Sequence, residues 1–330
     1  MGKYILLLHD AVDVDAPPDE QDTILQLTQI DEELIAAGFR TECMAFAGDL
    51  VSLEIHLKEH TPDVVFNLVE TFHGARFLHI IPALCEKLGI RITGAGATSL
   101  FLTSDKLVSK HLMKLGGIPT PGWIDPHKRD DWESFLARPL ICKPRMEDAS
   151  VGIDDSSIFT CASIKDLELR VDHAEANQLF IEEYIEGREC NISIATIDGV
   201  VTIFPIAEML FQDYPVSKPK IVGYDAKWLE DSFAYRHTLR SFSIDREVPL
   251  SSRLRQTALS CWHVFLCHGY GRVDIRIADD GTPYVLEVNM NPCIARDSGF
   301  IAACAESGLS YVEVIQGIVK EALCGISNIS

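Results

Sequence analysis

Residues 271–292, GRVDIRIADDGTPYVLEVNMNP, contain two apolar segments on either side of Asp280 and Gly281. An Asp-Gly pair between segments of alternating hydrophobicity predicts a β-hairpin. A two-residue or a four-residue loop centred on this pair gives the same register of the two strands. The pairing across the hairpin can therefore be predicted from the sequence.

This register places two acidic side chains directly opposite each other. Asp274 lies across from Glu287, and Arg272 lies across from Asn289. Opposed residues bring their Cβ atoms to roughly 4.5–5.5 Å, so two like charges there are unfavourable unless a cation lies between them. Carboxylate and amide oxygens are the ligands that Mg²⁺ selects, and Mg²⁺ held by few protein oxygens usually also binds substrate phosphates.

The second strand of the hairpin carries its polar groups on one face. Side chains alternate between the two faces of a strand. Glu287, Asn289 and Asn291 are therefore expected on one face, and Leu286 and Val288 on the other.

An ordinary solvated hairpin face is the alternative explanation of this pattern. Its acidic residues would then pair with Arg272 and Arg276. The apolar residues of the other face and the abrupt Asn-x-Asn-Pro ending favour metal binding instead.

The N-terminal third of the chain alternates between strand and helix patterns. KYILLLHD (3–10) and DVVFNLV (63–69) are short apolar runs typical of buried parallel strands. Helices are predicted within residues 17–40, where Gly38 suits the C-terminal cap, and within residues 78–90. This order predicts a parallel sheet covered by helices, with ligands at the carboxyl ends of its strands.

The remainder of the chain contains a second unit rich in strands. A helix is predicted from Ser104 to the glycine pair 116–117, followed by a linker, IPTPGWIDP, at 118–126. PLICKP (139–144) predicts a strand that leads into a turn of small and polar residues. From about Cys190 strands dominate, with a first hairpin turn at Asp198-Gly199.

The hairpin of residues 271–292 resembles the metal-binding strands of the ATP-grasp ligases, specifically the D-alanine–D-alanine ligase branch. Four further segments resemble motifs of that family and occur in the same order. They are TSDKLVSKHLMKLGGIPTP (103–121), LICKPRMEDASVG (140–152), FIEEYIEGRE (180–189) and YDAKWL (224–229). The resemblance covers most of the chain, and the shared order makes it specific.

The resemblance implies a three-domain ATP-grasp fold of mixed α/β and α+β class. An N-terminal parallel-sheet domain would occupy residues 1–104. A central subdomain with the nucleotide lid would occupy residues 105–187, and a C-terminal subdomain with the magnesium and substrate sites residues 188–330. ATP would be clamped between the last two.

The resemblance also implies the residues that bind ATP and metal. Three lysines would offset the triphosphate charge, a connector segment would hold adenine, and Glu189 would hold the ribose. The implied ATP-binding residues are Lys106, Lys143, Lys227, Glu182, Glu183, Tyr184, Ile185 and Glu189. Asp274, Glu287 and Asn289 would hold one or two Mg²⁺, or Mn²⁺ in their place.

The chemistry of the resembling family is the joining of a carboxylate to an amine. ATP phosphorylates the carboxylate, an amine attacks the acylphosphate, and an amide or peptide bond forms. Arg272 would stabilise the transferring phosphoryl group, and Ser298 would help to bind the second substrate. Ser150 in the lid and Tyr224 beside the third lysine complete the implied catalytic set.

The sequence departs from the family pattern mainly on the substrate side. No clear equivalent of the family's N-terminal glutamate is present in HDAVDVDAPPDEQD (9–22), although Asp13 and Glu20 are candidate substitutes. The segment NLVETFHGARF (67–77) also differs, and it contributes candidate substrate-binding residues. Those candidates, with Asn291, are Glu70, His73 and Arg76.

Two further departures concern the chemistry itself. Asp148-Ala149-Ser150 stands where the family has a glycine and two serines, and Cys293 stands where it usually has glycine. The resemblance implies an ATP-dependent carboxylate–amine ligase of the D-alanine–D-alanine ligase type, and these departures leave another amino acid or a peptide open as its substrate. The open alternatives are an ATP-grasp ligase for a non-amino-acid carboxylate and a nucleotide-binding protein without turnover.

The composition limits the partners of the protein. The chain has 330 residues, a formal net charge of −20 and 47% hydrophobic residues. Its acidity argues against binding of nucleic acid or an anionic membrane surface. No segment has the length of a transmembrane helix or the pattern of a signal peptide. Dimers are common in the resembling family, so a homodimer is one expected assembly.

The ten cysteines are scattered through apolar sequence without a CxxC pair. This pattern predicts buried free thiols and a cytoplasmic location. Cys261, His263, Cys267 and His268 form the only candidate zinc group, but their apolar neighbours at helical spacing favour a packed helix.

Overall fold

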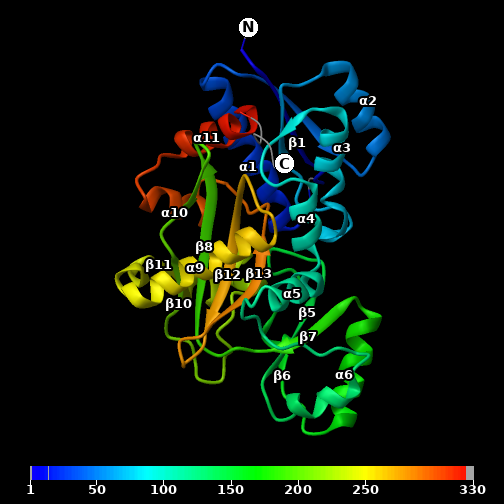
Figure 1. Ribbon diagram of the computed structural model, residues 1–330, viewed down its shortest axis with the longest axis vertical. Coiled ribbons are helices and arrows are strands. Elements are labelled where there is room, and N and C mark those ends of the chain that lie inside the picture. The colour runs from blue at the N-terminus through cyan, green and yellow to red at the C-terminus, as the bar shows by residue number, and fades with distance from the viewer. Residues whose placement is uncertain (1, 14, 325–330) are drawn as a thin grey trace.

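The computed structural model describes residues 2–13 and 15–324, which form three sheets with flanking helices. Figure 1 shows the N-terminal sheet at the top, the largest sheet in the middle and a small sheet at the bottom. β1, near the start of the chain, and α11, near its end, both lie in the upper part of the molecule.

The N-terminal sheet is parallel and has four strands in the order β2-β1-β3-β4. Its strands are β1 (Tyr4–Asp10), β2 (Arg40–Phe46), β3 (Val64–Leu68) and β4 (Arg91–Ile92). β1 and β3 are buried along their whole length, as the two apolar runs predicted. The parallel sheet is therefore confirmed.

The helices of this part cover both faces of the sheet. They are α1 (Pro18–Ala36), α2 (Leu50–His60) and α3 (Ile80–Leu88), whereas α4 (Ala97–Ser104) packs on α3 and on the helix that follows it. The helices predicted within residues 17–40 and 78–90 are present. β2, α2 and α4 were not predicted, and β2 is a half-exposed edge strand with little apolar signal.

The small sheet is antiparallel, in the order β6-β5-β7. Its strands are β5 (Leu140–Pro144), β6 (Ile158–Phe159) and β7 (Leu179–Glu183). α6 (Ile164–Ala176) packs on β7, and together these elements form a separate apolar cluster around Trp132, Leu140 and Leu167. The loop between β5 and β6 includes the predicted lid.

The large sheet has six strands and is antiparallel, in the order β11-β10-β8-β12-β13, with β9 paired to β8. Its strands are β8 (Arg188–Ile197), β9 (Val200–Ile203), β10 (Ala207–Phe211), β11 (Thr238–Ser241), β12 (Tyr270–Ile277) and β13 (Pro283–Asn289). The turn at Asp198-Gly199 joins β8 and β9 as predicted.

The remaining helices are α5 (Lys106–Leu115), α7 (Tyr224–Trp228), α8 (Phe233–His237), α9 (Val248–Val264), α10 (Gly299–Glu306) and α11 (Tyr311–Cys324). The helix predicted to begin at Ser104 begins at Lys106 instead. Asp105 is its N-cap, because the carboxylate accepts hydrogen bonds from the backbone N–H groups of Leu107 and Val108. Cys261 and His263 lie within α9, as the packed-helix interpretation predicted, but Cys267 and His268 lie beyond its end.

The hairpin of β12 and β13 confirms one half of the predicted register and corrects the other. Asp274 pairs with Glu287 and Arg272 pairs with Asn289 as predicted, but Ile275 pairs with Val285. One residue of β13, Leu286, is therefore extra, and the strand has a β-bulge there.

The loop of this hairpin compensates for the bulge. The N–H of Ala278 donates to the carbonyl of Thr282 at 3.0 Å, so three residues form the loop, ending at Gly281 with φ +80°. The predicted loop of two or four residues was wrong. The three-residue loop shifts the register by one, and the bulge restores it.

The bulge also overturns the predicted face of Leu286. Val288 is buried in the core behind the large sheet, whereas Leu286 lines the main cavity next to Glu287. The residues of a bulge break the strict alternation of side chains. An apolar side chain is thereby added to the polar face.

The N-terminal and large sheets share one hydrophobic core. Ile5 and Leu7 of β1 belong to the same buried cluster as Phe204, Tyr270 and residues of α10 and α11. The next side chains of β1, Leu6 and Leu8, face a different cluster with α2 and α3. α11 packs against α1, β3 and β8, which fixes the N-terminal sheet on the large one.

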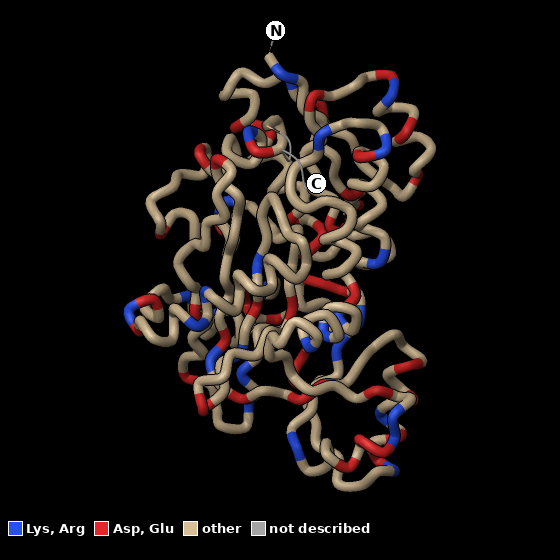
Figure 2. Tube along the Cα trace, viewed as in Figure 1, with Lys and Arg blue, Asp and Glu red and all other residues tan. Residues whose placement is uncertain are grey.

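Charged residues occur throughout the described chain. Figure 2 shows acidic residues in red along every part of the trace, with basic residues interspersed. All ten cysteines are free thiols as predicted, but only five are buried: Cys142, Cys267 and Cys293 are partly buried, and Cys43 and Cys324 are exposed. Among the helices of the described residues, none combines the length and apolar content needed to cross a membrane.

Gly187 precedes β8 at a point where a side chain has no room. Its φ is +139°, and an added Cβ would lie 1.9 Å from the carbonyl oxygen of Ile277. Gly199→Ala is the matched control, because Gly199 also has positive φ (+76°) but open space around it.

We expect Gly187→Ala to lower the free energy of unfolding by about 3 kcal/mol or more, and Gly199→Ala by about 1 kcal/mol. The midpoints of urea unfolding of the two variants and the wild type measure this difference. Equal losses would show that backbone strain alone, without the contact to Ile277, determines the effect.

Candidate active site

A cavity of about 720 Å³ lies where the three sheets meet. It is bounded by the ends of β1 and β3, the lid between β5 and β6, the connector after β7, and the β12–β13 hairpin. Asp10 and Glu70 lie at the carboxyl ends of parallel strands, where ligands are expected in such sheets. Most of the site residues predicted from the sequence line this cavity.

The opposed carboxylates of Asp274 and Glu287 lie on its floor. The guanidinium of Arg272 donates two hydrogen bonds to Asp274, at 2.7 and 2.8 Å. The side-chain amide of Asn191 donates to the same carboxylate at 2.8 Å. The second carboxylate, Glu287, lies 3.6 Å from the ammonium of Lys106.

Cations control the ionisation of Glu287. Burial raises its pKa, but the positive charges of Lys106, Lys227 and Arg272 outweigh burial and lower the pKa to about 2. Burial lowers the pKa of Lys227, with a further contribution from Arg272. The floor thus holds an ionised carboxylate beneath several crowded cations, an arrangement that a polyphosphate would neutralise.

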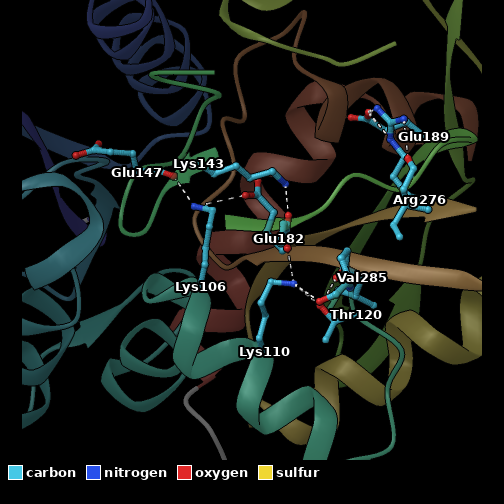
Figure 3. A network of polar contacts seen from close by, with 12 residues as sticks. Lys106, Lys110, Thr120, Lys143, Glu147, Glu182, Glu189, Arg276 and Val285 are labelled. Carbon is cyan, nitrogen blue, oxygen red and sulfur yellow. Dashed lines mark hydrogen bonds and ion pairs between the residues drawn. The ribbon is translucent and has the colours of Figure 1, made fainter. Parts of the chain in front are cut away.

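A buried glutamate between two lysines lies at one side of the cavity. Glu182 is 1% exposed, and its two oxygens lie 2.5 Å from the ammonium of Lys110 and 2.6 Å from that of Lys143. Lys110 also donates to Thr120 and to the carbonyl of Pro121. Figure 3 shows this chain of contacts from α5 to β5.

Lys110 was not predicted as a site residue. It lies one helical turn after Lys106, so these two of the three lysines of α5 point to the same side of the helix. That i, i+4 spacing was the available signal. Lys106 itself is 5% exposed and donates to the carbonyl of Glu147 in the lid.

The connector after β7 is held by a second buried ion pair. Arg276 of β12 donates to the carboxylate of Glu189 at 2.7 and 3.1 Å and to the carbonyl of Ile185 at 3.3 Å. Glu183, Tyr184 and Ile185 line the cavity beside this pair. In the alternative of a solvated hairpin face, Arg276 would be an exposed partner of the acidic residues. It is instead 3% exposed and positions the connector.

The lid is closed over the cavity. The hydroxyl of Ser150 donates to the carbonyl of Val222 at 2.7 Å, and the indole of Trp228 donates to the carbonyl of Ala149 at 3.0 Å. Ala149 and Ser150 both have positive φ, 56° and 64°. These contacts hold the lid against the segment that carries Lys227.

Tyr224 connects the same segment to the N-terminal part. Its hydroxyl donates to Asp19 of α1 at 2.6 Å. Tyr224 does not itself line the cavity, whereas Asp19 does. This residue therefore bridges two parts of the chain instead of facing the floor.

The end of the cavity nearest the N-terminal sheet is acidic. Glu70 accepts a hydrogen bond from Gln26 at 2.9 Å, and the thiol of Cys293 donates to Asp22 at 3.1 Å. Burial raises the pKa of Glu70 to about 8, despite the hydrogen bond from Gln26. The acidic residues that line this end are Asp10, Asp19, Glu20, Asp22, Glu70 and Asp297.

The other candidate substrate residues take different positions. Asn291 lines the cavity and donates to the carbonyl of Val69 at 2.9 Å. His73 and Arg76 do not line it. They flank Gly74 and Ala75, and the N–H of Ala75 donates to the carbonyl of Met146, so this segment supports the lid from behind.

A further cationic residue, Arg240, lines the acidic end and was not predicted. It lies on β11 against Gly299, next to Ser298, which caps α10. Among the described residues it has no ion-pair partner within 4.0 Å. Its segment, YRHTLRSF (235–242), has no counterpart among the motifs of the sequence analysis.

Comparisons with known proteins place the chain among ligases. A family model described as "D-ala D-ala ligase C-terminus" matches residues 112–320. An uncharacterized protein of Sinorhizobium fredii is 30% identical over 79% of this chain and 75% of its own length. A D-alanine–D-alanine ligase of Thermotoga sp. (strain RQ2) is 29% identical over 79% of this chain and 80% of its own.

The solved structures agree with these relatives in fold. The crystal structure of a D-alanine–D-alanine ligase from Bacillus anthracis complexed with ATP superimposes with a TM-score of 0.73. The match covers 98% of each chain at 22% sequence identity.

The buried pair of Lys110 and Glu182 should be important for stability. Lys110→Met leaves Glu182 with one cation, and we expect it to cost about 3–5 kcal/mol of the free energy of unfolding. Arg138→Met is the control, because it removes the exposed ion pair to the neighbouring Glu183. Its expected cost is within about 1 kcal/mol. Similar losses in urea unfolding of both variants would contradict a special role of burial.

The raised pKa of Glu70 should make stability depend on pH. The native state keeps this proton up to about pH 8, whereas the unfolded chain releases it near the ordinary value of 4.5. The contribution of Glu70 to the free energy of unfolding is therefore complete below about pH 4.5 and is lost as the pH rises to about 8.

Glu70→Gln removes the titratable carboxyl group, so this residue no longer makes the free energy of unfolding depend on pH. We expect the variant to gain stability relative to the wild type as the pH rises through this range, measured by urea unfolding at a series of pH values. A constant difference between the two proteins would show that Glu70 ionises alike in both states.

Proposed function

Because the chain belongs to the D-alanine–D-alanine ligase family of ATP-grasp enzymes, we propose that it joins a carboxylate to an amine by using ATP. The observation that supports this most strongly is the cavity floor. There, two opposed carboxylates, Asp274 and Glu287, lie under Lys106, Lys227 and Arg272. This combination suits a metal-bound triphosphate, because the metal would offset the carboxylates and the phosphates would offset the cations.

ATP is the proposed energy source, and its triphosphate would lie over the cationic floor. Lys106, Lys143 and Lys227 would offset its charge. The base would lie against the connector of Glu182, Glu183, Tyr184 and Ile185, with the ribose near Glu189. Leu286 adds an apolar contact from the bulge, because its side chain faces the same cavity.

The donor set fits Mg²⁺. Asp274, Glu287 and Asn289 offer oxygens on one face of the hairpin, and Mn²⁺ suits the same donors. When bound, the metal supplies charge neutralisation of the phosphate oxygens. Without the metal, Arg272 and Lys106 neutralise the two carboxylates. Once the metal binds, Arg272 and Lys106 would be free to contact the phosphates.

The reaction proceeds in two steps. An oxygen of the substrate carboxylate attacks the terminal phosphorus, the bond to the bridging oxygen breaks, and ADP leaves. The amine nitrogen then attacks the acylphosphate carbon, inorganic phosphate leaves, and the nitrogen loses a proton. Arg272 lies where it can stabilise negative charge in both steps. Ser150 and the closed lid would exclude water from the acylphosphate.

The substrates are proposed to be amino acids or peptides, with both charged groups recognised. The acidic end around Asp10, Asp22 and Glu70 would hold an ammonium group. Arg240 and Ser298, which line the same end of the cavity, would hold a carboxylate. Asn291 would orient the substrate, and His73 and Arg76 would act indirectly through the lid.

The division into units at 1–104, 105–187 and 188–330, a cytoplasmic location and a homodimer belong to the same proposal. A ligase for a non-amino-acid carboxylate is less favoured, because the acidic end suits an ammonium group. A nucleotide-binding protein without turnover is less favoured, because binding alone requires no Arg272 above a carboxylate pair.

Phosphate release tests the proposal. Purified protein with Mg-ATP is incubated with pairs drawn from a panel of amino acids and dipeptides, and free phosphate and the condensed product are measured. We expect turnover only with a cognate acid and amine together. Tight ATP binding without phosphate release from any pair would contradict a ligase of amino acids.

Glu287→Gln is the matched inactive variant. It keeps the size of the side chain but removes one metal-binding charge, so we expect phosphate release to fall at least about 100-fold. Its urea unfolding should remain cooperative, which shows that the fold is retained. Unchanged turnover would remove Glu287 from the metal site.

A further inference from the structure

A second group of potential metal ligands lies on the N-terminal sheet, outside the cavity. Glu42 belongs to the edge strand β2, and His56 and His60 belong to α2, which packs on the same sheet. One ligand atom of each lies within 4.8 Å of the other two. None of the three lines the main cavity.

The distances between the three atoms are those of a coordination site. Nε2 of His56 lies 3.2 Å from Oε1 of Glu42, and Nδ1 of His60 lies 3.2 Å from Nε2 of His56. Nδ1 of His60 lies 3.9 Å from the same glutamate oxygen. Zinc bonds of about 2.0–2.1 Å in a tetrahedron separate neighbouring ligand atoms by roughly 3.3 Å. The three atoms thus outline one face of such a tetrahedron.

The local structure brings these groups together. His56 and His60 are one turn apart on α2, so their imidazole rings project from the same side of the helix. Glu42 reaches them from the strand, and its other oxygen, Oε2, accepts a hydrogen bond from the hydroxyl of Tyr4 at 2.6 Å. Tyr4 is 6% exposed, so a fixed donor orients the carboxylate.

Ordinary hydrogen bonding does not satisfy the group. Nε2 of His56 is equally close to a carboxylate oxygen and to an imidazole nitrogen, but one proton on it serves only one of them. Among the described residues, no lysine or arginine lies within 4.0 Å of Glu42. Its ion-pair partners are the two histidines alone.

We propose that Glu42, His56 and His60 bind one Zn²⁺, with water in the fourth position. A set of two imidazole nitrogens and one carboxylate oxygen binds Zn²⁺ in preference to Mg²⁺. The side chains are 41%, 18% and 46% exposed, so the ion enters directly from solvent. The bound ion joins the edge strand β2 to α2 and stabilises the N-terminal sheet without taking part in catalysis.

Zinc titration of the full chain tests this inference. Zn²⁺ is added without nucleotide and with excess Mg²⁺, which occupies the carboxylates of the cavity floor, and binding is followed by calorimetry. We expect one tight site per chain in the wild type. Co²⁺ at the same site should give the visible absorption of a four-coordinate ion.

Two variants remove one ligand each. His60→Ala and Glu42→Gln should each weaken zinc binding by roughly 100-fold or more, since losing a ligand costs at least as much as losing an outer partner. Tyr4→Phe should weaken it by roughly tenfold, because the carboxylate loses its orienting hydrogen bond. His127→Ala is the control, because His127 is an exposed histidine outside the group.

The outcomes are distinct. Zinc should raise the midpoint of thermal unfolding of the wild type and of His127→Ala, but not of His60→Ala or Glu42→Gln. With EDTA, all four proteins should unfold alike, which shows that the variants fold. Equal zinc affinity in the wild type and both ligand variants, or no zinc uptake by the wild type, would overturn the assignment. Phosphate release should be the same in all four proteins.

Discussion

Repulsion between the carboxylates of Asp274 and Glu287 is the constraint on which the centre of this molecule depends. Backbone pairing of β12 and β13 forces the two groups together, and neither can move away while the hairpin exists. The surrounding residues therefore supply positive charge from three directions. Arg272 comes from β12, the strand that also carries Asp274. Lys106 comes from α5 and Lys227 from α7.

The same arrangement couples nucleotide recognition to the fold. α5 carries Lys106 toward the floor and Lys110 toward Glu182, so one helix contacts both ends of the expected nucleotide site. The ion pair of Arg276 and Glu189 fixes the connector on β12, which is also the strand of Asp274. A shift of β12 would thus move the connector, Asp274 and Arg272 together.

The sequence was most informative where regular strands carry charge. The parallel sheet, the pairing of Asp274 with Glu287 and the positions of the lysines around the cavity followed from alternation and family motifs. The bulge at Leu286 could not be predicted, because an extra residue in one strand and a three-residue loop cancel in the register. Only the side chain of Leu286, which faces the cavity, reveals the bulge and the three-residue loop.

Tertiary contacts explain the other differences. The local sequence around Lys110 does not distinguish it from an ordinary surface lysine. Its burial depends on Glu182, more than seventy residues away in the sequence. The acidic end likewise gathers Asp10, Asp22 and Glu70 from three separate elements. β2 carries too few buried residues to give a clear strand pattern, so neither the strand nor the histidines facing it could be placed.

The core shared between the first and last parts of the chain has a consequence for biosynthesis. One face of the N-terminal sheet packs against α2 and α3, which follow closely in the sequence. The opposite face is completed only by Phe300 and residues of α11, near the end of the chain. Since chains are made from the N-terminus, Ile5, Leu7 and Phe66 stay incompletely covered until α11 has been synthesised. One face of the nascent sheet therefore exposes apolar side chains while the middle of the chain is synthesised.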